Sequence, residues 1–193
     1  MLTQERIEEI LRDSGALLEG HFILTSGRHA GRYMQCAKIL QYPNYTQELT
    51  GHLKQSFKDD GVQMVIAPAV GGIVLGYELA RQLGVQSIFT EREDGKMVLR
   101  RGFEIPAGTK VLVAEDVVTT GGSVKEVIEV AKAAGAVVVG VALLVDRSGG
   151  TVDFGTKCIA AYTTAIASYE PENCPLCKGG AIQAIKPGSR AVK

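Results

Sequence analysis

From residue 62 onward, the chain alternates short aliphatic runs with segments at helical spacing. The runs are apolar at consecutive positions, which is typical of strands that helices cover on both faces of a sheet. Between them, 73–83 and 124–134 have the length and spacing of helices, and each is followed directly by a glycine, Gly84 and Gly135. This alternation predicts parallel strands joined by right-handed crossovers. The expected strands are 62–70, 85–89, 111–118, 137–145 and 158–162.

A further helix is predicted at the N-terminus. Ile7, Ile10 and Leu11 form an apolar stripe at helical spacing. Thr3 is expected to cap this helix and Gly15 to end it.

The segment 89–106 interrupts the alternation because it is crowded with charged residues. Asp94-Gly95 within it is a dipeptide typical of a hairpin turn. We interpret the segment as an exposed, mobile flap.

Composition excludes several classes of protein. The 193 residues are 46% apolar and 22% charged, which is the balance of a soluble globular protein. Basic and acidic residues cancel to zero formal net charge, so the long-range field that attracts nucleic acid or anionic membranes is missing. No apolar run approaches the roughly 18 residues of a membrane span, and the N-terminus has no signal-peptide pattern. We therefore expect a cytoplasmic protein with reduced cysteines and no nucleic-acid or membrane partner.

No internal repeat and no clear linker divides the chain, so 1–193 is expected to form a single domain. Its core would comprise residues 50–150 approximately. Residues 1–40 and 150–193 would form a small accessory layer.

The most informative stretch is the end of the strand 111–118. Two adjacent acids, Glu115 and Asp116, lead into a loop of hydroxyl residues and glycines and then into a helix. Ser123 and Glu126 have the spacing of a capping box at the start of that helix. Converging backbone N–H groups and the positive end of a helix dipole favour an anion. Because buried acids are costly without a ligand, we interpret the stretch as a phosphate site rather than an ordinary capped turn.

Competing phosphate motifs are absent from the sequence. No Gly-x-x-x-x-Gly-Lys-Ser/Thr occurs, and no two of the 23 glycines are two residues apart. A Walker nucleotidase and the Gly-x-Gly-x-x-Gly dinucleotide fingerprint are therefore both excluded.

The stretch resembles the phosphoribosyl pyrophosphate signature of type I phosphoribosyltransferases, in which two acids follow a hydrophobic strand and precede a Thr-Gly-rich loop. Three further segments resemble the orotate phosphoribosyltransferases in particular, in that family's order. They are 22–27 with Tyr33 downstream, 68–72, and Asp146-Arg147.

The resemblance implies the type I phosphoribosyltransferase fold, an α/β fold with a central, mostly parallel sheet flanked by helices, a small N- and C-terminal hood and a flexible flap. It implies Mg²⁺-dependent transfer of phosphoribose from phosphoribosyl pyrophosphate to orotate, giving orotidine 5′-monophosphate and pyrophosphate in pyrimidine biosynthesis. Substrate phosphates and water would hold the Mg²⁺, with no protein ligands assigned. A homodimer is also implied, in which the flap reaches the neighbouring subunit's site.

The same resemblance assigns roles to individual residues. Glu115 and Asp116 would hold the ribose hydroxyls, and Asp116 would favour the transition state. Arg147 would pair with the orotate carboxylate as a planar fork, and Phe22 would also contact orotate. On the pyrophosphate side, Gly71 and Gly72 would contact phosphoribosyl pyrophosphate, and Arg92 and Lys96 would act as catalytic cations on the flap. Thr119 would also contact orotate. The residues around the 5-phosphate would be Val117, Val118, Thr119, Thr120, Gly121, Gly122 and Ser123.

The sequence departs from the familiar pattern of this family at three positions. Thr25 and Gly71 stand where lysines are common, and Val98 stands near the usual place of a flap histidine. Two alternative functions stay open. They are a phosphoribosyltransferase for another base, which has no evident use for Arg147, and a phosphoribosyl pyrophosphate-sensing regulator that binds nucleic acid, which zero net charge disfavours.

Cys174-Pro175-Leu176-Cys177 is a second motif, similar to one half of a zinc-ribbon site. One half supplies two of four ligands, so a metal site, a redox pair and a turn with two reduced thiols all stay open. The other candidate ligands are scattered, at Cys36, Cys158, His21, His29 and His52.

Overall fold

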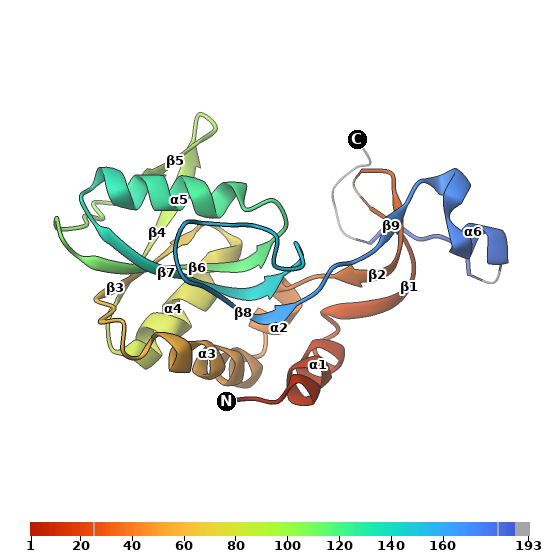
Figure 1. Cartoon of the computed structure of the whole chain (residues 1–193), viewed down its shortest axis with the longest axis horizontal. Coiled ribbons are helices and arrows are strands. Elements are labelled where there is room, and N and C mark those ends of the chain that lie inside the picture. The colour runs from red at the N-terminus through yellow and green to blue at the C-terminus, as the bar shows by residue number, and fades with distance from the viewer. Residues whose placement is uncertain (25, 181, 188–193) are drawn as a thin grey trace.

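The main body of the molecule is a six-stranded sheet with helices on both faces, and a three-stranded sheet lies beside it (Figure 1). The computed structural model describes residues 1–24, 26–180 and 182–187. Neighbouring strands of the large sheet, in the order β5-β4-β3-β6-β7-β8, are parallel except for β4 and β5. The expected α/β fold with a mostly parallel sheet is thereby confirmed. The strands are β3 (Met64–Pro68), β4 (Gln86–Glu93), β5 (Lys96–Leu99), β6 (Lys110–Val118), β7 (Val137–Asp146) and β8 (Cys158–Thr163).

Helices cover this sheet from both sides. α3 (Pro43–Phe57) and α4 (Gly71–Leu83) pack on one face, and α5 (Gly122–Ala133) packs on the other (Figure 1). Leu53 of α3 and Leu75 of α4 are fully buried in the first of two apolar clusters, and α5 contributes its stripe to the second. Each such side chain stabilises the fold by about 1.5–3 kcal/mol relative to its exposed state.

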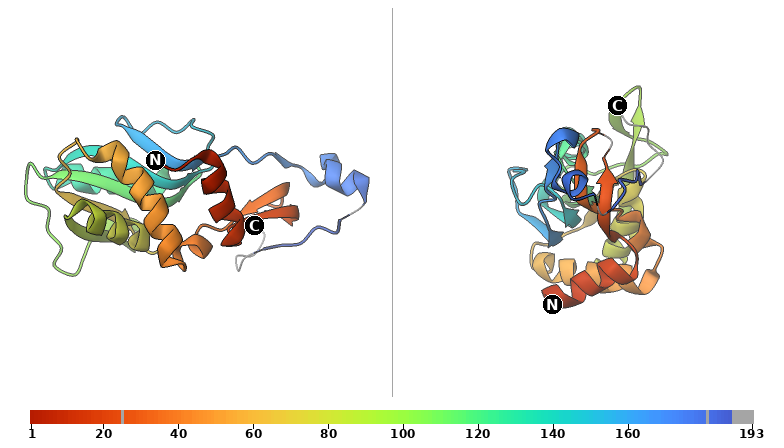
Figure 2. Two further views of the ribbon diagram at one scale, coloured as in Figure 1. Left: turned by 90° about the horizontal axis from the view of Figure 1, so that it is seen from below. Right: turned by 90° about the vertical axis from the view of Figure 1, so that its right-hand side faces the viewer.

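The three-stranded sheet, which we call the hood sheet, is antiparallel in the order β1-β2-β9. After β8 the chain runs through β9 and out to α6, and residues 182–187 then return along β1 (Figure 2). The backbone N–H of Ile23 donates to the carbonyl oxygen of Ile185 at 2.8 Å. The elements at this end are α1 (Gln4–Asp13), β1 (Leu17–Ile23), β2 (His29–Met34), α2 (Ala37–Leu40), β9 (Ser168–Tyr169), the 3₁₀ helix η1 (Pro171–Asn173) and α6 (Pro175–Gly179).

The N-terminal helix agrees closely with its prediction. The Thr3 hydroxyl accepts a hydrogen bond from the Arg6 backbone N–H at 3.2 Å, and Ile7, Ile10 and Leu11 are buried. Each strand expected from an aliphatic run is also present, with ends shifted by a few residues.

The sequence pattern did not reveal α3, because two positions on its buried face are threonines. Thr46 and Thr50 are buried, and the Thr50 hydroxyl donates to the Thr46 carbonyl oxygen at 2.7 Å. Hydroxyls satisfied inside their own helix can occupy core positions without showing an apolar stripe.

The charged segment contains the expected hairpin between β4 and β5. Asp94 and Gly95 both have positive φ, at 49° and 82°, as in the turn type that joins twisted strands tightly. The hairpin extends the edge of the large sheet, with Arg92 opposite Met97.

No helix within the described ranges is both long enough and apolar enough to cross a membrane.

Candidate active site

The candidate site lies at the carboxyl end of β6, a central strand between β3 and β7. Ligands of parallel sheets bind outside the carboxyl ends of the strands. In Figure 1, the arrowheads of β6, β7 and β8 point toward the hood sheet. The predicted phosphate loop, which we call the β6–α5 loop, joins β6 to the first turn of α5 at this end.

The expected capping box at the start of α5 is wrong. The helix begins at Gly122, one residue before Ser123, and its N-cap is Gly121 with a φ of 78°. Ser123 is therefore inside the first turn, and no side chain caps the helix. The Glu126 carboxylate instead accepts two hydrogen bonds from the guanidinium of Arg92 on the β4–β5 hairpin, with N–O distances of 2.9 and 2.8 Å. The uncapped N–H groups of this turn stay available to an anion.

The β6–α5 loop borders an open cavity of about 220 Å³. The side chains of Val152 and Phe154 pack closely against Gly121, because a Cβ at this position would lie 2.7 Å from Val152 and 2.9 Å from Phe154. The backbone of the loop therefore approaches a neighbouring segment more closely than any side chain allows. Lining the cavity are Arg92, Glu115, Val117, Val118, Thr119, Thr120, Gly121, Gly122, Ser123, Val124 and Glu126.

The pKa values of the two acids near the end of β6 are raised. Glu115 is 7% exposed, and burial, followed by the charge of Asp116, raises its pKa to about 9. Burial also raises the pKa of Asp116. Glu115 is therefore protonated at neutral pH, so the pair can offer both a hydrogen-bond donor and charged acceptors.

The loop between β3 and α4 packs closely against the end of β6 that carries these acids. A Cβ at Gly71 would lie 2.8 Å from both carboxylate oxygens of Asp116, and one at Gly72 would lie 3.1 Å from the carbonyl oxygen of Ala114. A lysine at position 71, common in the family, would require Asp116 to move. Thr25, the other position of this kind, lies outside the described residues.

Arg147 follows β7 directly, beside the β6–α5 loop. Its backbone N–H donates to the carbonyl oxygen of Val118 at 2.8 Å. The Asp146 carboxylate fixes the following turn by accepting from the N–H groups of Ser148 and Gly150, at 2.7 and 3.0 Å. The Arg147 Nε is buried and has no hydrogen-bond partner among the described residues. Burying a guanidinium nitrogen without a hydrogen-bond partner costs free energy unless a ligand supplies the acceptor.

The two candidate cations of the flap occupy different surroundings. Arg92 lines the cavity of the β6–α5 loop in its own chain, where Glu126 holds it. Lys96 lines a separate hollow with Lys125 and Glu129. The structure thus brings Arg92, and not Lys96, to the loop of the same subunit.

Phe22 lies in β1, where it is buried and packs against Tyr33 with 5.9 Å between ring centroids. It is not among the residues that line the cavity.

Lys186 is a candidate that sequence reasoning missed. Its Nζ is buried without a hydrogen-bond partner among the described residues, and the preceding Ile185 bridges to Phe22. The Gly- and Pro-containing tail has no periodicity, so nothing in the local pattern indicated a buried ammonium there.

Comparisons with known proteins agree with this arrangement. A family model described as a phosphoribosyl transferase domain matches residues 35–160. The orotate phosphoribosyltransferase of Desulforamulus reducens is 56% identical over 99% of this chain and 100% of its own length. That of Heliobacterium modesticaldum is 57% identical over 98% and 100%.

Solved structures show the same fold. The orotate phosphoribosyltransferase from Aeropyrum pernix superposes with a TM-score of 0.67 at 27% identity, covering 81% of this chain and 93% of that one. An adenine phosphoribosyltransferase from Thermoanaerobacter pseudethanolicus superposes with a TM-score of 0.59 at 15% identity, over 68% and 88%, and shows the fold alone.

Proposed function

The chain belongs to the orotate phosphoribosyltransferases, and from that premise we propose how its residues carry out the reaction. The enzyme transfers phosphoribose from phosphoribosyl pyrophosphate to orotate, giving orotidine 5′-monophosphate and pyrophosphate, a step of pyrimidine biosynthesis. One observation carries the assignment of the site. Two adjacent acids, the buried Glu115 and the partly buried Asp116, lie near the end of a central strand, shortly before a helix of 12 residues that begins without a side-chain cap.

The β6–α5 loop, residues 117–123, binds the 5-phosphate. Backbone N–H groups of the first turn of α5 and the hydroxyls of Thr119, Thr120 and Ser123 are the donors. The positive end of the helix dipole adds attraction for the phosphate.

Glu115 and Asp116 bind the ribose hydroxyls. Protonated Glu115 donates to a hydroxyl oxygen, and the Asp116 carboxylate accepts from a hydroxyl hydrogen. As the bond between C1 and pyrophosphate breaks, positive charge grows on the ribose ring, and the negative charge of Asp116 stabilises it.

Arg147 binds the carboxylate of orotate. Its buried Nε lacks a partner in the described part of the chain, and a bidentate carboxylate would satisfy that nitrogen together with a terminal one. A base without a carboxylate would leave it unpaired, which supports orotate over other bases. Thr119 and Phe22 stay expected neighbours of the base.

The pyrophosphate leaving group is bound by Gly71, Gly72, Arg92 and Lys96. Backbone N–H groups of the two glycines approach it from the β3–α4 loop. Arg92 supplies a guanidinium next to the cavity of its own chain, and Lys96 acts across the subunit interface.

Mg²⁺ fits this donor set as a substrate-bound ion. Asp116 is the carboxylate nearest the ribose, and Mg²⁺ prefers oxygen ligands, most of which phosphates and water supply. When bound, the ion neutralises charge that develops on pyrophosphate.

A homodimer is supported by apolar side chains exposed on one side of α4. Val70, Val74 and Tyr77 are 82%, 47% and 64% exposed and recur at helical spacing. Exposed apolar residues gathered in this way mark association sites. A second copy of the chain would cover them and would bring the flap to the neighbouring site.

The decisive test measures the loss of orotate ultraviolet absorbance with Arg147→Ala beside the wild type. Loss of this pair of charge-assisted hydrogen bonds predicts a KM for orotate raised by at least about tenfold, because each such bond contributes about 1.5–3 kcal/mol and tenfold corresponds to about 1.4 kcal/mol. The KM for phosphoribosyl pyrophosphate should change little. Arg12→Ala, an exposed arginine on α1, is the matched control. An unchanged KM for orotate in Arg147→Ala would remove the carboxylate assignment.

A further inference from the structure

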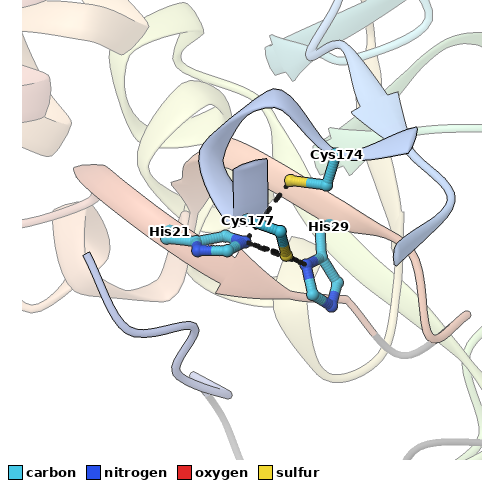
Figure 3. Close-up of side chains that lie close together, drawn as sticks. All are labelled: His21, His29, Cys174 and Cys177. Carbon is cyan, nitrogen blue, oxygen red and sulfur yellow. Dashed lines mark hydrogen bonds between the residues drawn. The ribbon is translucent and has the colours of Figure 1, made fainter. Parts of the chain in front are cut away.

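Outside the active site, the fold gathers two histidines and two cysteines at the hood sheet (Figure 3). His21 comes from β1, His29 from β2, Cys174 from the N-cap of α6 and Cys177 from α6 itself. We call these four side chains the hood cluster. Their nearest nitrogen and sulfur atoms all lie within 4.8 Å of one another.

The spacing within the hood cluster matches a tetrahedral metal site. The His21 Nε2 lies 3.5 Å from the Cys174 Sγ and 3.6 Å from the Cys177 Sγ, and the His29 Nδ1 lies 3.2 Å from the Cys177 Sγ. Bonds of about 2.0–2.1 Å to nitrogen and 2.3 Å to sulfur put tetrahedral neighbours about 3.3–3.8 Å apart. The two histidine nitrogens are closer, at 2.8 Å, and need to separate by only about half an ångström to reach that range.

The His21 ring is oriented as in a metal ligand. Its Nδ1 lies 3.0 Å from the carbonyl oxygen of Ile182. Because a carbonyl oxygen only accepts, this nitrogen carries the hydrogen, and the lone pair is on Nε2, which faces the other three side chains. Histidines that bind metals generally donate their second ring N–H to such a partner, which fixes the tautomer.

The burial pattern fits a closed site with a route of entry. Cys174 is 0%, His21 2% and His29 8% exposed, while Cys177 is at the surface. Cys174 and Cys177 are separated by two residues, one of them a proline, which is the spacing of a zinc knuckle.

The surrounding segment lacks an apolar core that could hold it by itself. Neither η1 nor α6 has a buried residue within its bounds, and Ile182 and Ile185 are 52% and 58% exposed. The chain nevertheless crosses the β1–β2 hairpin from one edge to the other, pairing with β2 through β9 and with β1 through Ile185. Small units with little core are commonly held by a metal.

We propose that the hood cluster binds one Zn²⁺ ion with all four side chains. Two thiolates and two imidazoles in tetrahedral order favour Zn²⁺ over Mg²⁺, which prefers oxygen. Four protein ligands leave no open position, so the ion is structural, and it fastens the C-terminal segment to the β1–β2 hairpin. Both thiols lose their protons on binding.

The test measures zinc per chain by elemental analysis of untagged protein, expressed with zinc and exchanged into metal-free buffer. We expect one zinc per chain in the wild type and at least a tenfold loss in Cys177→Ser. Cys158→Ser, an exposed cysteine outside the cluster, is the matched control and should retain the metal. Because Cys177 is exposed, its variant should fold, which circular dichroism checks.

Co²⁺ gives a second readout on the same protein. Refilling the chelator-treated wild type with Co²⁺ should produce the visible bands of a tetrahedral site and a sulfur-to-cobalt charge-transfer band, both lost in Cys177→Ser. Removal of zinc should also lower the melting temperature of the wild type. These readouts do not depend on orotate turnover, so they are separate from the tests of the active site.

Three outcomes would overturn the proposal. The first is wild-type protein without stoichiometric zinc that also fails to take up Zn²⁺ or Co²⁺ after thiol reduction. The second is equal zinc in the wild type and Cys177→Ser. The third is a Cys174–Cys177 disulfide in protein isolated with thiols blocked at lysis, which would assign the pair to redox chemistry.

Discussion

At the scale of single residues, the position of the Asp116 carboxylate leaves no room for a side chain at Gly71. The carboxylate of Asp116 occupies the space of a side chain at position 71, with both oxygens 2.8 Å from a Cβ placed there. A side chain at position 71 would therefore require the Asp116 carboxylate to move. In the proposed mechanism, the positive charge near the pyrophosphate comes from Arg92 and Lys96.

We predict that Gly71→Ala lowers kcat/KM at least about tenfold, because a Cβ at this distance displaces Asp116 from the ribose, and a tenfold loss corresponds to about 1.4 kcal/mol of transition-state stabilisation. Steady-state kinetics checks this. Gly51→Ala is the control, since its Cβ meets only the Gln82 side chain at 3.4 Å. Activity equal to that of the control would contradict the displacement of Asp116.

Glu115 makes stability depend on pH. Its pKa is raised from 4.5 to about 9 in the folded chain, so the unfolded chain loses this proton at lower pH than the folded chain. The stability contribution is fully present below pH 4.5 and is lost as the pH rises through 9. The slope is at most about 1.4 kcal/mol per pH unit for one proton.

We predict that Glu115→Gln removes this slope. A glutamine keeps the shape of the protonated acid and cannot ionise, so the variant should become progressively more stable than the wild type as the pH rises from about 5 to about 9. Urea unfolding at several pH values measures the difference. Parallel stability profiles would show that Glu115 ionises normally in the folded chain.

At the scale of elements, the β4–β5 hairpin and α5 meet through Arg92 and Glu126. Their side chains are 45% and 40% exposed, so the ion pair contributes less than about 1 kcal/mol to stability. If Arg92 binds the substrate as proposed, the Glu126 carboxylate competes with that anion for the same guanidinium.

We predict that Glu126→Gln lowers the KM for phosphoribosyl pyrophosphate and that Arg92→Ala raises it, by about three- to tenfold each at low salt, since a charge of this exposure is worth about 1 kcal/mol. Both effects should shrink as salt screens the charges. Arg101→Ala removes an ion pair with Glu91 beside the same hairpin and serves as the control. Changes of the same sign in both variants would contradict the competition.

At the scale of the whole molecule, the side of α4 that carries Val70, Val74 and Tyr77 is apolar and exposed. The α4 helix also leads out of the loop that contacts Asp116. A second copy of the chain on this face would therefore connect assembly to the active site.

We predict that Tyr77→Lys shifts the protein from dimer to monomer, because a charge buried at an apolar contact without a partner is strongly unfavourable. Size-exclusion chromatography with light scattering measures the mass over a range of concentrations. Val137→Lys is the control, because Val137 is 51% exposed at the start of β7. A wild type that is monomeric at all concentrations would refute the dimer.

Local pattern was sufficient for most of the parallel core and for the position of the β6–α5 loop. Buried parallel strands are continuous aliphatic runs, and Glu115, Asp116 and the glycines after them are adjacent in the chain. Local pattern failed where a residue's partner is distant. Glu126 has the spacing of a capping residue but pairs with Arg92, and α3 hides its buried face behind threonines whose hydroxyls bond within the helix.

The sequence by itself determined the fold class, the family and the residues that make up the β6–α5 loop, because these depend on neighbouring residues and on the spacing of one element. Only the tertiary structure decided the surroundings of Gly71, the hood cluster, and the burial of the Arg147 Nε without a partner in the described part of the chain. His21 and Cys174 are 153 residues apart in the chain and 3.5 Å apart in the fold. No pattern of neighbours can indicate such a contact, because the pairing of β1, β2 and the returning C-terminal segment creates it.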